Sequence, residues 1–219
     1  MPLYTAEALI LRTYKLGDAD RIVVFLTRDR GKKRGVAKGA RRQRSRFVGA
    51  LEPLTDVRVA YFERERRELV GMNYAETIRS PLAISGSDAL GYVSYFAELL
   101  DEWAQDADAD ERLYRLGVSM LDALAAGVPA EPLARYFECW LLRLQGLYPE
   151  ARGNLSPGAA AFLAASRAVP PRGVGELPAD RGVLKELEHV HRSLIAMHLE
   201  KTLKSDRVLR DIGRQSSAS

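Results

Sequence analysis

The chain has 219 residues and a net charge of +4 at pH 7, and 47% of its residues are hydrophobic. This length allows one large domain or two small ones, and no apolar run is long enough to cross a bilayer. The single cysteine excludes an internal disulfide, and residues 1–15 lack the features of a secretory signal. We therefore expect a cytoplasmic protein.

Residues 1–80 have the pattern of five short strands. The predicted strands cover residues 4–14, 21–27, 35–38, 57–62 and 69–78, which are rich in β-branched and aromatic residues. Turn residues separate the first three, at Gly17-Asp18 and at Asp29-Arg30-Gly31. Five strands in a segment of this length fit a small closed barrel, and the OB-fold is a barrel of this kind that binds oligonucleotides.

The pattern changes to helical spacing after Ser80-Pro81. Apolar residues three to four apart predict helices through residues 90–100, 110–126 and 132–144. Ser156-Pro157 is a cap followed by proline, which predicts a helix start there, and a final helix is expected over 181–210. The fold class is thus α+β in two parts: a five-stranded barrel domain at 1–80 and an all-α domain at 81–219.

The charge is distributed unevenly between these parts. Residues 1–80 carry 18 Lys and Arg against 10 Asp and Glu, whereas residues 81–219 carry 15 against 19. Such asymmetry indicates a polyanionic partner for the first part.

A basic segment accounts for most of this excess, because no acidic residue occurs between Gly31 and Leu51. Its eight cations are Lys32, Lys33, Arg34, Lys38, Arg41, Arg42, Arg44 and Arg46. Interspersed glycines and a serine suggest a mobile loop that approaches a phosphate backbone. A solvated surface loop is the alternative, but solvated charge runs usually mix both signs.

Aromatic residues near the basic segment are possible stacking partners for bases. They are Tyr14, Phe25, Phe47, Tyr61 and Phe62. Most fit better in the barrel core. Phe47 is the exception that we expect to stack, because it directly follows the basic run.

Other side chains with possible chemistry have simpler explanations. His189, His191 and His198 lack metal-ligand spacing and are expected on a polar helix surface, and Cys139 is expected to be a buried structural thiol. The acidic cluster between Glu98 and Glu111 fits a helix surface and a cap better than a metal-dependent nuclease. No phosphate-binding loop or dinucleotide motif occurs, so we expect no enzymatic activity.

The C-terminal region is a second basic segment. Lys204 and Arg207 share a helix face if the final helix extends that far. They are either a second contact with the polyanionic partner or cations that compensate a helix dipole.

One motif in the basic segment resembles the RecO family of bacterial recombination mediators. The matching residues are Lys38-Gly39-Ala40-Arg41-Arg42, Ser45-Arg46 and Gly49-Ala50-Leu51-Glu52-Pro53, and later Leu155-Ser156-Pro157-Gly158-Ala159. The resemblance extends over most of the chain, including the stretch HLEKTLKSDRVLRDI near its end. Many members carry a four-cysteine zinc module, but the corresponding connection here, residues 146–154, has no cysteine. We therefore expect no zinc and no cofactor.

The resemblance implies a non-catalytic, nucleoid-associated mediator of DNA repair and recombination. Such a protein binds single- and double-stranded DNA and anneals complementary strands. It acts with RecR and with the acidic tail of single-stranded-DNA-binding protein, and so helps RecA to load. An RNA-binding OB-fold protein is the alternative that the charge and the fold also permit.

Overall fold

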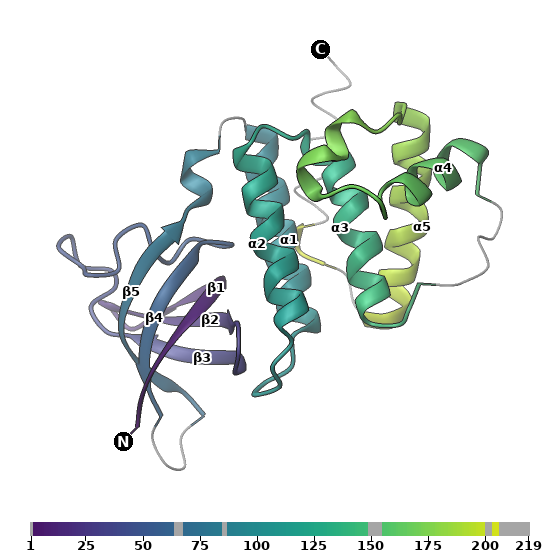
Figure 1. The fold of residues 1–219 in the computed structure, drawn as a ribbon. Coiled ribbons are helices and arrows are strands. Elements are labelled where there is room, and N and C mark those ends of the chain that lie inside the picture. The colour runs from purple at the N-terminus through teal and green to yellow at the C-terminus, as the bar shows by residue number, and fades with distance from the viewer. Residues whose placement is uncertain (1, 64–67, 85–86, 149–154, 200–202, 206–219) are drawn as a thin grey trace. The chain divides into compact units, whose positions relative to one another are not determined.

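The computed structural model describes residues 2–63, 68–84, 87–148, 155–199 and 203–205. Five strands form a closed barrel in the order β1-β2-β3-β5-β4 (Figure 1). Their bounds are β1 Leu3–Leu16, β2 Asp20–Thr27, β3 Gly31–Ala37, β4 Asp56–Phe62 and β5 Val70–Arg79. All neighbours pair antiparallel except β3 and β5, which pair parallel. This confirms the predicted OB-type barrel.

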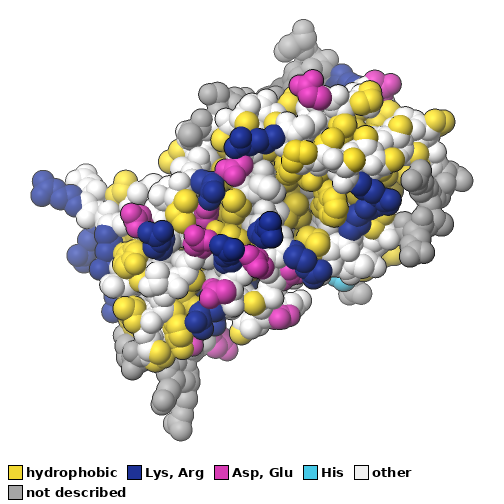
Figure 2. All heavy atoms as spheres, in the orientation of Figure 1, with side chains coloured by type: hydrophobic (Ala, Val, Ile, Leu, Met, Phe, Trp, Pro, Cys, Tyr) yellow, Lys and Arg dark blue, Asp and Glu magenta, His cyan; other side chains and the backbone are white. Residues whose placement is uncertain are grey.

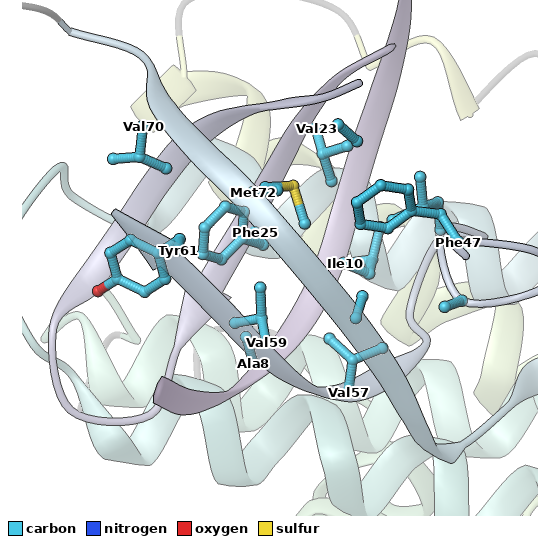
Figure 3. Packing of buried hydrophobic residues seen from close by; sticks show 14 of the residues in the cluster. Ala8, Ile10, Val23, Phe25, Phe47, Val57, Val59, Tyr61, Val70 and Met72 are labelled. Carbon is cyan, nitrogen blue, oxygen red and sulfur yellow. The ribbon is translucent and has the colours of Figure 1, made fainter. Parts of the chain in front are cut away.

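The barrel core is formed by the alternate side chains that the strands turn inward (Figure 3). Phe25 of β2 and Tyr61 of β4 are fully buried at its centre, with ring centroids 5.6 Å apart in an edge-to-face arrangement. Val57 and Val59 of β4 complete the same face. The apolar alternation in these strands is therefore explained by a single interior.

The predicted third strand is wrong in its bounds. The expected strand covered residues 35–38, but β3 begins at Gly31, so Lys32, Lys33 and Arg34 lie in the sheet and not in a mobile loop. Each pairs with a residue of β2 in regular antiparallel register. The side chains of these cations are consequently fixed by strand geometry.

The helices are α1 Ser87–Trp103, α2 Glu111–Ala125, α3 Ala130–Leu144, α4 Pro157–Ala165 and α5 Arg181–Leu199, with 3-10 turns η1 Pro81–Ala83 and η2 Pro171–Glu176. The final helix was predicted over residues 181–210, whereas α5 ends at Leu199; residues 200–202 and 206–210 of the prediction lie outside the described part. Two compact units emerge from the contacts: residues 1–83 with 93–121, and residues 84–92 with 122–219. Among the described helices, none has the length and apolar character needed to span a membrane.

In the first unit, helix α2 and the end of α1 pack directly on the barrel. A Cβ added to Gly117 of α2 would lie 2.5 Å from the Leu9 side chain of β1, so a larger residue there would displace that side chain. Tyr114 of α2 donates a hydrogen bond of 2.8 Å to the buried carboxylate of Asp56 on β4. These helical residues are thus part of the barrel's own packing.

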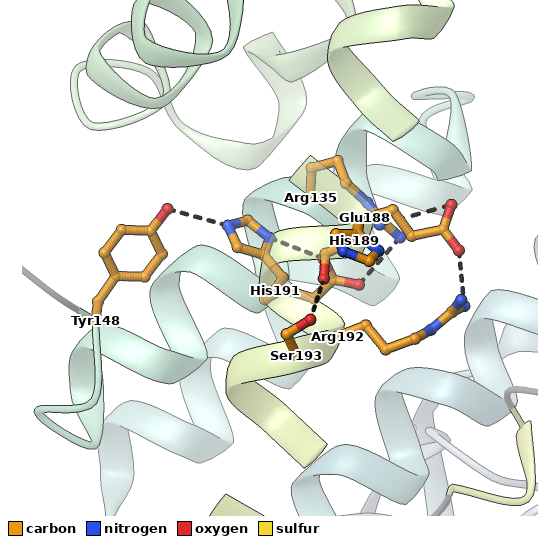
Figure 4. Close-up of polar contacts among 8 residues, drawn as sticks. Arg135, Tyr148, Glu188, His189, His191, Arg192 and Ser193 are labelled. Atoms are coloured by element: carbon orange, nitrogen blue, oxygen red, sulfur yellow. Dashed lines mark hydrogen bonds and ion pairs between the residues drawn. The ribbon is translucent and has the colours of Figure 1, made fainter. Parts of the chain in front are cut away.

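The second unit contains a buried polar chain that links α3 to α5 (Figure 4). His191 Nδ1 lies 2.9 Å from Glu138 Oε2, and its Nε2 lies 3.1 Å from the Tyr148 hydroxyl. Arg135 forms an ion pair of 3.0 Å with the same glutamate. His191 is fully buried, so its expected place on a polar surface is wrong, whereas His189 is exposed.

Two smaller predictions for this unit are confirmed. Ser156 caps α4, because its hydroxyl accepts a hydrogen bond from the Ala159 amide and Pro157 occupies the first turn. Cys139 is 1% exposed on α3, and burial raises the pKa of its thiol to about 11. The cysteine is therefore a packed, weakly nucleophilic side chain.

Candidate nucleic-acid interface

The connection between β3 and β4 carries five of the predicted cations and is held firmly at its start. The Gly39 amide donates to Asp20 Oδ1 at 2.8 Å, and the Arg41 amide donates to the Ala19 carbonyl at 2.9 Å. The Arg41 guanidinium also donates to the carbonyls of Gly17 and Asp18, at 3.1 and 3.0 Å. The turn between β1 and β2 therefore fixes the orientation of this connection.

The Phe47 side chain anchors the second half of the connection in the barrel core. Its side chain is 2% exposed and belongs to the barrel core together with Ala50 and Leu51 (Figure 3). The Arg46 guanidinium lies over the Phe47 ring, 5.3 Å from its centroid, within the range of a cation–π contact. The expectation that Phe47 stacks on a base is therefore wrong for this conformation, because its ring is already packed.

The cations of the connection are presented to solvent. We define the cationic loop as residues 38–46, with its five basic side chains Lys38, Arg41, Arg42, Arg44 and Arg46, all exposed. On the face shown in Figure 2, Lys and Arg side chains gather at the edge where Figure 1 draws this connection. None of the five forms an ion pair with a described carboxylate. Their charge is thus available to an external anion.

Two other predicted cations, Lys32 and Lys33, form ion pairs with carboxylates of the first unit. Lys32 Nζ donates to the Asp101 carbonyl at 2.6 Å and lies 3.4 Å from the Asp101 carboxylate, with only 11% of its side chain exposed. Lys33 Nζ forms an ion pair of 2.9 Å with Glu63. Arg34 is exposed on β3. The basic segment therefore divides into two paired cations, Lys32 and Lys33, and six exposed ones, which are Arg34 on the strand and the five of the loop.

The first part of the acidic cluster neutralises cations of the barrel. Arg12 of β1 lies 3.6, 3.3 and 3.9 Å from carboxylate oxygens of Glu98, Asp101 and Glu102. Asp110 caps α2 by accepting from the backbone amides of Arg112 and Leu113. These carboxylates thus form ion pairs with Arg12 or cap α2, and Glu98 is buried and not on the expected helix surface.

Of the five aromatic candidates, two were placed correctly in the core, and the exposed apolar residue Val48 was not considered. Phe25 and Tyr61 are core residues, whereas Tyr14 is 45% exposed near the end of β1. Val48 is 71% exposed directly after the anchored Phe47. Tyr14 pairs with Ile22 close to the β1–β2 turn, so its closeness to the turn residues Gly17-Asp18 was the available signal of its exposure.

The C-terminal cations are only partly described. Lys204 is exposed, and Arg207 lies outside the described residues. Residues 149–154 of the connection without cysteines are also outside them. The chain holds one cysteine in total, so it cannot supply four cysteine ligands to a metal.

Comparison with known proteins identifies the family. The family description "Recombination protein O N terminal" matches residues 1–81, and "Recombination protein O C terminal" matches residues 85–152. The chain belongs to the RecO family. The DNA repair protein RecO of Koribacter versatilis is 41% identical over 152 residues, which are 68% of this chain and 61% of that relative. The RecO protein of Bifidobacterium adolescentis is 45% identical over 130 residues, 57% and 51% of the two chains.

Further RecO relatives match over a similar extent. The protein from Anaeromyxobacter sp. strain K is 39% identical over 142 residues, covering 64% of this chain and 56% of the relative. The matched part thus spans little more than half the length of these RecO proteins. The N-terminal RecO match contains the entire barrel and the cationic loop.

Proposed function

We propose that this chain is a non-catalytic DNA repair and recombination mediator that binds single-stranded DNA through the cationic loop. The observation that carries the proposal is the set of five exposed cations, which pair with no described carboxylate and lie on a connection braced against the β1–β2 turn. The names of the matched relatives, DNA repair protein RecO, support DNA as the polyanion.

The arrangement suits electrostatic binding of a flexible strand. Arginine keeps its charge at all physiological pH values and makes bidentate contacts with phosphate. Four of the five loop cations are arginines. Because such contacts release counterions, binding is sensitive to salt and readily reversible. Reversible charge neutralisation lets two complementary strands approach, and we infer that the loop promotes their annealing and also binds double-stranded DNA.

The remaining assignments extend this proposal to partners. We assign DNA binding to residues 1–80 and partner contacts to residues 81–219, with Lys204 and Arg207 as a second DNA contact. The partners are RecR and the C-terminal tail of single-stranded-DNA-binding protein, through which RecA loads onto coated DNA. A cytoplasmic protein associated with the nucleoid is consistent with these partners.

A strand-annealing assay tests the proposal. The variant Arg42→Ala/Arg44→Ala/Arg46→Ala removes three loop cations and keeps Arg41, which braces the loop. We expect it to anneal complementary oligonucleotides much more slowly than the wild type.

The matched control is Arg58→Ala/Arg112→Ala/Arg115→Ala, which removes the same charge from exposed positions on β4 and α2. Equal annealing by the wild type and the loop variant would contradict the proposal. Competition between DNA and RNA strands of one sequence decides the nucleic acid, and a clear preference for RNA would favour the alternative of an RNA-binding protein.

A further inference from the structure

A pocket of about 500 Å³ opens at the seam where β3 and β5 pair. This volume lies within the range of roughly 300–1,000 Å³ that is common for small-ligand sites. The seam contains just three paired positions, of which Val36 opposite Gly71 is the central one. Burial alternates along both strands, with Ala37 and Met72 in the core and this central pair half-buried. The pocket floor is therefore the outward face of the seam.

Phe62 forms an aromatic wall of this pocket. A Cβ added at Gly71 would lie 2.1–2.7 Å from three ring carbons of Phe62, so the ring packs directly on the glycine backbone. Any other residue at Gly71 would displace the ring. Leu69 also lines the pocket, so the floor and walls present apolar surface and one aromatic ring.

The rim of the pocket is charged and belongs to the cationic loop. Lys38 and Arg46 both line the opening and are exposed. Glu68 adds a carboxylate that accepts hydrogen bonds and offsets one of the two positive charges, and Asn73 adds an amide that both donates and accepts. An apolar cavity with an aromatic wall, two cations at its mouth and a few hydrogen-bonding groups matches the chemistry of a nucleotide: a flat base with phosphates on either side.

We propose that this pocket receives one unstacked base of the bound single strand, while Lys38 and Arg46 contact the flanking phosphates. The inference rests on the proposed function and adds to it, because the cationic loop alone binds phosphates without reading bases. Duplex DNA keeps its bases stacked and paired, so the pocket makes the site prefer a single strand over a duplex.

The test compares a homopolymeric oligonucleotide with one of equal length in which abasic residues replace every nucleotide. We expect the wild-type chain to bind the base-bearing strand about tenfold more tightly, the lower part of the range for stacking of one base. Val36→Met fills the floor with an aliphatic chain, and Phe62→Leu removes the aromatic wall. Each is expected to reduce the difference to about twofold or less. The control Ile78→Met changes an exposed residue of β5 outside the pocket.

The outcomes separate the pocket from the proposed function. Equal affinity of the wild type for both strands refutes the pocket while DNA binding stands, and absence of binding to either strand refutes the function itself. A tenfold preference that persists in folded Val36→Met and Phe62→Leu also refutes the pocket. A 2-aminopurine base in the strand gives a readout without mutation: altered emission on binding supports insertion, and unchanged emission contradicts it.

Discussion

Removal of three loop arginines should weaken the salt dependence of DNA binding by a calculable amount. If about five cations neutralise phosphates of a single strand, the slope of log affinity against log salt is about −3.5. The wild type then loses about a hundredfold in affinity between 50 and 200 mM salt. Arg42→Ala/Arg44→Ala/Arg46→Ala leaves about two contacts, a slope of about −1.4 and a loss of about sevenfold.

Fluorescence anisotropy with a labelled oligonucleotide at several salt concentrations measures both slopes. The control Arg58→Ala/Arg112→Ala/Arg115→Ala carries the same net charge as the loop variant and should keep the wild-type slope. A slope of the loop variant that stays at about −3.5, or a control that loses as much slope as the loop variant, would contradict this prediction. Either result would mean that the affinity for DNA depends on the net charge of the whole chain, or that another surface binds the DNA.

Four further predictions concern the residues that the structure assigns to packing. Lys32→Ala should lower the free energy of unfolding by about 2 kcal/mol, because it removes charge-assisted hydrogen bonds, and should leave the salt slope unchanged; a reduced slope would return Lys32 to the DNA contacts. Phe47→Ala should cost about 3–5 kcal/mol in urea unfolding, as for other buried phenylalanines, and a cost under about 1 kcal/mol would argue against a core role. Glu138→Ala should cost about 3–5 kcal/mol, because it leaves Arg135 as a buried charge without this carboxylate; a thermal melt like that of the wild type would contradict the buried pair. Cys139, with its pKa raised to about 11, should react with an alkylating reagent at pH 8 only after unfolding, since about a thousandth of the thiol is thiolate at that pH, and rapid reaction of the folded protein would show that it is accessible.

The strand pattern was readable from sequence wherever burial alternates along one strand. Val57, Val59 and Tyr61 alternate inward, and Leu113 and Met120, apolar residues of the helix predicted over 110–126, are buried. The start of β3 was not readable in this way, because Gly-Lys-Lys-Arg has the composition of a solvated loop. It becomes a strand through pairing with β2.

Contacts between distant residues also explain the errors within the site. Lys32 is covered because the 105–107 segment pairs with it, the Lys32 amide donating to the Gln105 carbonyl at 3.0 Å. His191 can be buried because its Nδ1 forms a hydrogen bond with the carboxylate of Glu138, which lies 53 positions earlier in the sequence. Phe47 follows four arginines in sequence, yet its side chain points into the barrel while theirs remain exposed. Local composition identified the charge of the segment, and tertiary packing determined which of its side chains remain exposed to an external anion.

The most direct test of the central claim is a crosslinking map of bound single-stranded DNA. A strand with photoreactive bases is irradiated on the full chain, and the crosslinked peptides are identified by mass spectrometry. We expect crosslinks concentrated in residues 36–48 and in the pocket residues Phe62 and 68–73, with any contribution of the C-terminal cations appearing near Lys204. Crosslinks confined to other parts of the chain, with none in these segments, would contradict the central claim.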